Sequence, residues 1–219
     1  MSSTATPIAE QVTVLVAGMA AQAPAEVLGA FAAEQQQLDQ AGVPAGVTTP
    51  GTPVPDAELL DIHGQPTTLN AARDGRPAVI VFYRGAWCPY CNLALRTYQE
   101  HLVGPLTDRG AALIAVSPQK PDGSLTMQQA NELTFTVVSD PGNQIAARLG
   151  ILTAPTDDAQ HAQAAVGLDL TAVNADGTRT LPMPTTVIVD SAGIIRWIDV
   201  HPNYATRTEP AEILAAYDA

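Results

Sequence analysis

The sequence predicts an α/β fold in which a mixed central sheet is flanked by helices and preceded by a helical extension. A continuous apolar run rich in β-branched residues at 78–83 and a second apolar run at 111–117 are typical of strands buried on both faces of a sheet, and 135–140 is a third predicted strand. Helical patterns separate these runs, so the strands are joined by crossovers and must be parallel. A later pair of runs, 185–190 and 194–200, flanks a short turn and adds an antiparallel hairpin.

The composition is that of a globular protein with an acidic surface. The chain has 219 residues, of which 46% are hydrophobic, and this is enough for a sizeable core. With a net charge of −12, the protein lacks the basic surface typical of nucleic-acid-binding proteins, and anionic membranes should repel it. The apolar stretch near the N-terminus follows no Lys or Arg and is too short to span a bilayer. We therefore expect a cytoplasmic protein.

The first elements along the chain are helical. Residues 8–40 are rich in Ala, Gln, Glu and Leu, with Val27, Leu28 and Phe31 near helical spacing. The Gly- and Pro-rich stretch that follows is typical of a linker. We therefore divide the chain into a helical extension with its linker, 1–50, and a domain, 51–219.

The domain begins with a predicted hairpin, 57–69, whose turn is at His63-Gly64. Residues 151–182 are predicted to be irregular and to cover one side of the site. The loop 201–210 carries His201 and Arg207, either of which could approach the site, but polar side chains of such a loop are more often solvated and we do not count them among the site residues. Helices are predicted at 88–101, 122–132, 142–149 and 209–217. This order of elements is that of a thioredoxin-like fold.

The only two cysteines, Cys88 and Cys91, lie together in "FYRGAWCPYC" at the carboxyl end of the first buried strand. We expect Cys88 at the N-cap of the next helix and Pro89 in its first turn, where a missing N–H has no cost. Backbone N–H groups, the helix dipole and the nearby Arg84 would lower a cysteine pKa there from about 8.5 to roughly 3.5–7.5. Cys91 lies one helical turn further on, within disulfide reach. The motif predicts an activated thiolate with a partner in place.

Two other interpretations of the cysteine pair carry less weight. A structural zinc site needs four ligands, and the chain offers one cysteine pair with histidines scattered singly at His63, His101, His161 and His201. Inert thiols would pack as small hydrophobic side chains, yet their position at a strand-to-helix turn favours chemistry. We therefore expect no metal and no bound cofactor.

Aromatic residues and a proline are expected around the thiols. Trp87, Tyr90 and Tyr83 are compatible both with core packing and with an apolar rim. Pro184-Thr185 begins a later strand, which in such a sheet starts beside the cysteines. A cis bond before Pro184 would let this backbone pair with an extended substrate, although only about one X–Pro bond in twenty is cis. The residues predicted to bind substrate or to stabilise the thiolate are Arg84, Trp87, Tyr90, Pro184 and Thr185.

Residues 51–219 resemble the AhpC/TSA (redoxin) branch of the thioredoxin superfamily, in particular peroxiredoxin-like members that carry FYRG-x-WCPYCN. The matching segments are, in order, "VIVFYRGAWCPYCN", "LIAVSPQ", "FTVVSDPGN", "LPMPTTVIVDSAGIIRW" and "EPAEIL". The resemblance implies a thioredoxin-like fold and thiol-dependent reduction of peroxides with electrons from a thioredoxin-type donor. It is also compatible with a homodimer, because dimers are common in the family.

The sequence departs from the peroxiredoxin pattern P-x-x-x-T-x-x-C. In that register Cys91 takes the peroxide-reacting position, Cys88 replaces the threonine and Arg84 replaces the proline. The family's thiolate-stabilising arginine should stand just before "TTVIVD", where this chain has Pro184. The peroxiredoxin register therefore favours Cys91 as the attacking thiol, whereas the thioredoxin register and the N-cap favour an exposed Cys88.

The leading hypothesis is a thiol oxidoreductase that reduces hydroperoxides through a dithiol–disulfide cycle of Cys88 and Cys91. An external thiol, either of thioredoxin type or of low molecular weight, would restore the dithiol. One alternative is a thioredoxin-like protein-disulfide reductase with little peroxidase activity. Another is a non-catalytic module whose N-terminal helices bind a partner.

Overall fold

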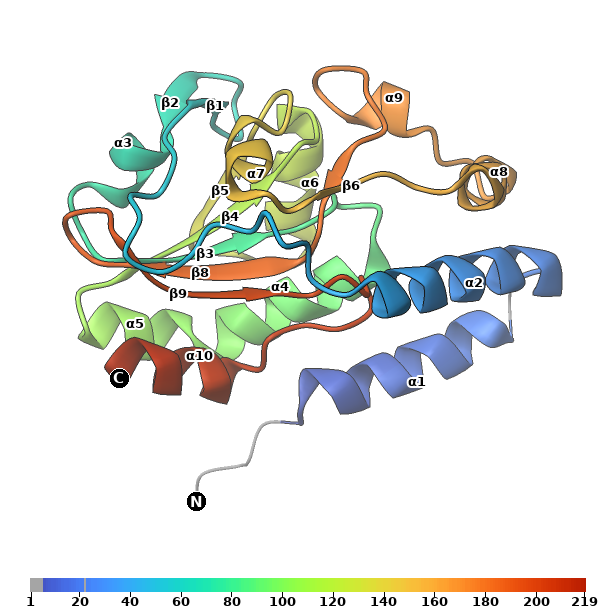
Figure 1. Ribbon diagram of the computed structural model, residues 1–219, viewed down its shortest axis with the longest axis horizontal. Coiled ribbons are helices and arrows are strands. Elements are labelled where there is room, and N and C mark those ends of the chain that lie inside the picture. The colour runs from blue at the N-terminus through green and yellow to red at the C-terminus, as the bar shows by residue number, and fades with distance from the viewer. Residues whose placement is uncertain (1–5, 22) are drawn as a thin grey trace.

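A seven-stranded mixed sheet forms the centre of the computed structural model, which describes residues 6–21 and 23–219 (Figure 1). The strand order is β2-β1-β5-β4-β3-β8-β9. β3 pairs in parallel with β4 and antiparallel with β8, while β5 pairs in parallel with β4. The strands are β1 (Glu58–Leu60), β2 (Pro66–Thr68), β3 (Ala78–Phe82), β4 (Ala112–Ser117), β5 (Thr136–Ser139), β8 (Thr185–Val189) and β9 (Ile195–Val200). A separate two-stranded ribbon joins β6 (Leu152–Thr153) to β7 (Leu181–Pro182).

Helices cover both faces of the sheet, as the fold class predicts. α4 (Pro89–His101), α5 (Val103–Asp108) and α10 (Pro210–Asp218) pack on one face, and α3 (Leu69–Arg73) and α7 (Gln144–Leu149) on the other (Figure 1). Every residue of β3 is buried, with Val79 and Val81 in one core and Ile80 and Phe82 in the other. This burial explains why the strand reads as a continuous apolar run. The remaining helix beside the sheet is α6 (Pro121–Ala130).

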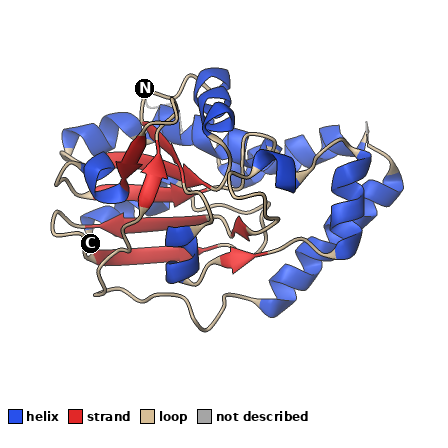
Figure 2. Cartoon of the chain, turned by 90° about the horizontal axis from the view of Figure 1, so that it is seen from above, coloured by secondary structure: helices blue, strands red, loops and turns tan. Residues whose placement is uncertain are grey.

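The predicted N-terminal helices are α1 (Ile8–Ala20) and α2 (Ala25–Ala41), which lie with α8 (Asp157–Ala165) at one end of the strands (Figures 1 and 2). α1 packs against α4, and α2 packs against α8. The backbone N–H groups of Ile8 and Ala9 donate to the Glu209 carboxylate at 2.9 and 3.0 Å. The division of the chain at residue 50 stays a prediction. No helix in the described ranges is long and apolar enough to cross a membrane.

Most predicted elements are confirmed, including the hairpin at His63-Gly64 and the strands at 78–83, 111–117 and 135–140. The structure adds the short helices α3 and α5, which the pattern did not indicate. The prediction that 151–182 is irregular is wrong, because this stretch contains α8 and α9 (Leu170–Val173). The α8 segment "DDAQHAQAA" has no large apolar side chain to mark a helical face.

The missing apolar pattern of α8 is compensated by capping and by contacts with α2. The Thr156 side chain accepts a hydrogen bond from the N–H of Ala159 at 3.2 Å, as an N-cap does. Glu34 of α2 is buried, and its carboxylate accepts the N–H of Thr156 at 2.9 Å. The helix therefore depends on a partner that is distant in sequence.

Candidate active site

The cysteine pair lies where the sequence predicts, between the end of β3 and the start of α4. Cys88 is the N-cap residue of α4 and Pro89 is its first residue. The side-chain amide of Asn92 donates to the carbonyls of Ala86 and Cys88 at 2.7 and 2.9 Å, which holds the turn that carries the first cysteine. Cys88 is 1% exposed and Cys91 is 0% exposed. The expectation of an exposed Cys88 is therefore wrong.

Cys91 is the thiol whose surroundings favour the ionised form. Burial raises the pKa of Cys91, but this effect is outweighed by a hydrogen bond from Cys88, by the charge of Arg207, and by the backbone N–H and charge of Arg84. Together they lower the pKa of Cys91 to about 5. The nearest cation is Arg207, whose Nη2 donates to the Cys91 sulfur at 3.1 Å. At neutral pH Cys91 is therefore a thiolate.

Cys88 has the opposite electrostatic character. Burial raises its pKa well above the ordinary range, and the hydrogen bond to Cys91 and the negative charge of Cys91 raise it further. The Cys88 side chain also makes no capping hydrogen bond to the first N–H groups of α4. The N-cap argument thus places Cys88 correctly but assigns the thiolate to the wrong sulfur. The Cys88 thiol therefore stays protonated beside the Cys91 thiolate.

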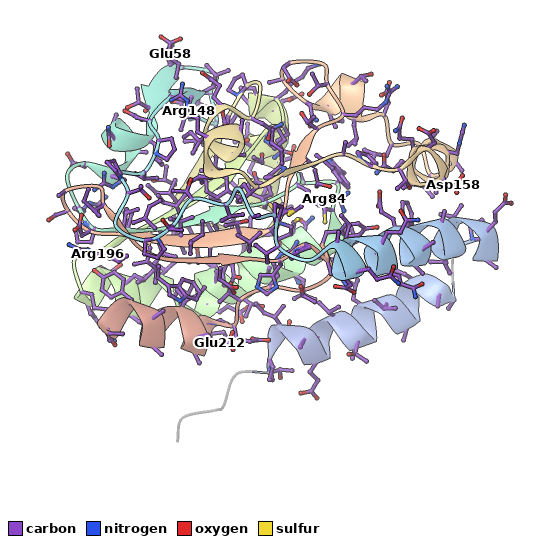
Figure 3. All side chains as sticks on the ribbon, in the orientation of Figure 1. Glu58, Arg84, Arg148, Asp158, Arg196 and Glu212 are labelled. Atoms are coloured by element: carbon purple, nitrogen blue, oxygen red, sulfur yellow. The ribbon has the colours of Figure 1, made fainter. Side chains whose placement is uncertain are left out.

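Arg84 lies inside the molecule, between α2 and the central sheet (Figure 3). Its guanidinium stands 3.8 Å from the centroid of the Tyr204 ring and 5.1 Å from that of Trp87, so it is held by cation–π contacts on two aromatic faces. Its charge lowers the pKa of Cys91 less than that of Arg207 does. The structure thus brings Arg84 to the site as the second cation.

Trp87 and Tyr90 form the aromatic wall around the pair. Tyr90 is buried and packs against Tyr204 with ring centroids 6.3 Å apart, whereas Trp87 is half-buried. Gly85 has φ +153°, and a Cβ at this position would collide with the indole nitrogen of Trp87. Glycine is therefore required for the turn that seats Trp87.

Pro184 and Thr185 line the same small pocket as Cys91 and Arg207, as do the ring of Tyr83 and the side chain of His201. No described residue follows a cis peptide bond, so the bond before Pro184 is trans and the cis hypothesis is wrong. The Thr185 hydroxyl donates to the Met183 carbonyl at 2.9 Å. Thr185 therefore borders the pocket with its hydroxyl hydrogen already bonded to the protein.

Sequence reasoning missed Arg207. Arg207 belongs to a polar loop whose sequence cannot be distinguished from that of an ordinary solvent-exposed turn. Its side chain nevertheless turns inward to the sulfur of Cys91. The only available signal in the sequence was the lack of an arginine at the family's position, which Pro184 occupies. Among residues 6–21 and 23–219, no group of three or more His, Cys, Asp or Glu side chains could hold a metal ion.

The chain is similar to several proteins of known family. The model of the AhpC/TSA family matches residues 50–198. A Mycobacterium tuberculosis protein provisionally named a peroxiredoxin is 33% identical over 97 residues, which are 44% of this chain and 60% of that protein. The chloroplastic peroxiredoxin Q of Triticum aestivum is 23% identical over 177 residues, covering 81% of this chain and 70% of the wheat protein. The alignment thus spans less than two thirds of the mycobacterial relative.

Solved structures support the fold. The peroxidoxin BcpB of Mycobacterium tuberculosis superposes with a TM-score of 0.58 at 18% identity, over 78% of this chain and 97% of that one. Reduced Prx3 of Vibrio vulnificus, solved in complex with hydrogen peroxide, gives a TM-score of 0.61 at 17% identity, over 78% of this chain and 99% of that one. Identities this low establish the shared thioredoxin-like fold, and the match of the family model over 50–198 establishes the family. This chain, with its thiolate on the second cysteine of WCPYC, is a member of the AhpC/TSA family.

Proposed function

We propose that the protein is a thiol peroxidase in which Cys91 attacks a hydroperoxide and Cys88 resolves the product. The observation that carries this assignment is the contact of 3.1 Å between the Arg207 guanidinium and the Cys91 sulfur. A cation so close favours the thiolate over the thiol, and the thiolate is the nucleophile. The peroxide complex of the Vibrio vulnificus relative supports the same substrate class here.

The proposed cycle uses the two cysteines, one hydroperoxide and two external thiols. The Cys91 thiolate attacks one peroxide oxygen, so that an S–O bond forms, the O–O bond breaks, and the alkoxide takes a proton from water to leave as an alcohol. Cys91 is then a sulfenic acid. The Cys88 sulfur attacks the Cys91 sulfur, and hydroxide leaves with the thiol proton as water. Two external thiols reduce the resulting disulfide and are themselves oxidised to a disulfide.

The electrostatic difference between the two thiols suits this order of events. Burial, and then the hydrogen bond and the charge of Cys91, keep the Cys88 thiol protonated while Cys91 is negative. Conversion of Cys91 to a neutral sulfenic acid removes the contribution of its charge, so the pKa of Cys88 falls from its raised value although burial still acts on it. Because residues three apart on a helix have Cβ atoms about 5–6 Å apart, a small adjustment brings the sulfurs to bonding distance. Oxidation of Cys91 thus removes part of what holds the proton on Cys88.

The burial of both sulfurs favours small hydroperoxides over protein disulfides. We propose that the reductant is a thioredoxin-type protein or a low-molecular-weight thiol, and that no metal or organic cofactor takes part. The homodimeric state and the cytoplasmic location stay predictions from the sequence. Sedimentation at several concentrations and cell fractionation would address them.

One experiment separates the peroxidase from a protein-disulfide reductase. The reduced protein receives one equivalent of hydrogen peroxide, and intact mass is followed with time beside a sample that receives oxidised thioredoxin. We expect peroxide to cause a fast loss of about 2 Da, the two hydrogens of a disulfide, and oxidised thioredoxin to act far more slowly. Fast oxidation by thioredoxin with an inert peroxide sample would overturn the peroxidase assignment.

The reaction with peroxide should have an acid limb near pH 5. Because only the thiolate reacts and the pKa of Cys91 is lowered to about 5, the second-order rate constant should be flat from neutral pH down to about pH 6. Below about pH 5 it should fall tenfold per pH unit as the thiolate is protonated. Stopped-flow tryptophan fluorescence can measure this, since Trp87 borders the site. A midpoint near the ordinary thiol value of about 8.5 would contradict it.

A further inference from the structure

The loop that delivers Arg207 to Cys91 is held on both sides of that arginine. Arg207 itself contributes part of the rigidity, because its Nη1 donates to the carbonyls of Tyr204, at 2.7 Å, and Thr206. Its two sequence neighbours, Thr206 and Thr208, both bond to side chains near the end of β9. Among the described residues, neither hydroxyl is hydrogen-bonded to a thiol, so the proposed cycle does not account for these bonds.

On the N-terminal side of Arg207, the loop is fixed through His201. One ring nitrogen of His201, Nδ1, is 2.8 Å from the Thr206 hydroxyl, and the other, Nε2, is 2.9 Å from Oδ2 of Asp199. The Thr206 hydroxyl also donates to the Asn203 carbonyl at 2.9 Å. The imidazole therefore bridges β9 and the residue that precedes Arg207.

On the C-terminal side, the same carboxylate holds Thr208. The Thr208 hydroxyl donates to Oδ2 of Asp199 at 2.8 Å, and the Thr208 carbonyl accepts from the Tyr98 hydroxyl at 2.8 Å. Tyr98 lies on α4, the helix that carries Cys91. The hydrogen bonds from His201 and Thr208 lower the pKa of Asp199, which keeps the carboxylate ionised as an acceptor. The loop is thus tied both to β9 and to the helix of the reactive thiol.

We propose that His201 and Asp199 are positioning residues that hold Arg207 against the Cys91 sulfur. This proposal deepens the proposed function and rests on it for the role of Arg207. The interaction between a guanidinium and a thiolate weakens as their distance grows and as water enters between them. A loop anchored on both flanks keeps this distance short. A loop released from β9 would let the long arginine side chain turn to solvent, where its rotamers are free.

The test follows the ionisation of each cysteine in full-length protein. Because the chain has two cysteines, labelling with [13Cβ]cysteine gives two NMR signals, and each thiol titrates separately. Glutamine cannot bridge Thr206 and Asp199 at once, so we expect H201Q to raise the Cys91 midpoint by about one pH unit toward the ordinary value. The matched control is H161Q, because His161 is exposed on α8, far along the chain from the site. The control should leave the midpoint in place.

A second variant keeps the test decisive if H201Q folds poorly. Thr206 is exposed, so T206V removes the hydroxyl that His201 contacts without opening the core. It should shift the midpoint in the same direction, and the double variant H201Q/T206V should shift it no further than H201Q alone. A lower melting temperature with an unmoved Cys91 midpoint in both single variants would overturn the positioning role. An unmoved Cys91 midpoint in R207M would also overturn it, because Arg207 would then have no role in the ionisation of Cys91. Peroxide turnover is measured in a separate experiment, so failure of the positioning role and failure of the peroxidase function are distinguishable.

Discussion

Replacement of Cys91 by serine should abolish the reaction with hydroperoxide, whereas Cys88→Ser should retain the first chemical step. The cause is the unequal ionisation of the pair, since the pKa of Cys91 is lowered to about 5 and that of Cys88 is raised well above its ordinary range. In C88S the Cys91 thiolate still has the Arg207 contact and should form a sulfenic acid that no partner resolves. Mass spectrometry after one equivalent of peroxide should show a gain of about 16 Da, one oxygen atom, in C88S and no change in C91S.

Serine is the matched replacement at both positions because it keeps the size and a hydroxyl donor in the buried site. Turnover with an external thiol should fall by at least about a hundredfold in both variants, since each lacks half of the disulfide. The reverse pattern, with sulfenic acid in C91S and none in C88S, would make Cys88 the attacking thiol. That result would contradict the electrostatic assignment even if peroxidase activity were established for the wild type.

Arg207→Met should lower the rate constant for peroxide at pH 7 by about a hundredfold. Methionine keeps much of the apolar stem but removes the charge that stands 3.1 Å from the sulfur. Its loss should raise the Cys91 midpoint by about two pH units. In the proposed cycle the variant would also lose a fixed donor beside the O–O bond that breaks, where negative charge develops, and losing such a donor costs about 10²–10³ in rate. Stopped-flow kinetics from pH 4 to 9 can separate the two contributions.

Two control variants sharpen the result for Arg207. R179M removes the same charge from an exposed loop position and should change neither the rate nor the midpoint. R207K keeps a charge but loses the planar fork, so it should fall between wild type and R207M. An R207M protein with wild-type kinetics would leave Arg84 as the cation that holds the thiolate.

The sequence predicts the parts of this protein whose signal is local. The runs that become β3 and β4 are buried along their whole length, so burial appears directly as a nearly unbroken apolar sequence, and β5 is buried after its first residue. The position of Cys88 at the N-cap of α4 likewise follows from the adjacent strand and proline. These features need no knowledge of residues distant in the chain.

The features that sequence reasoning missed depend on contacts between distant segments. Thr156, the N-cap residue of α8, donates its N–H to Glu34, which lies 122 residues earlier in the chain. Arg207 meets Cys91 across 116 residues, and nothing in its own neighbourhood indicates which way its side chain points. The identity of the thiolate is also a long-range property, because it depends on that cation. The helix terminus, which the sequence does reveal, favours the wrong sulfur.

The placement of both cysteines in the first turn of α4 has a consequence for survival under oxidative stress. In the proposed cycle, the sulfenic acid on Cys91 forms beside its resolving thiol, one turn away at the start of the same helix. No unfolding of a distant segment is needed before the disulfide closes, so the time in which a second peroxide molecule could produce an irreversible sulfinic acid is short. We therefore expect the protein to resist hyperoxidation and to keep working when peroxide is abundant.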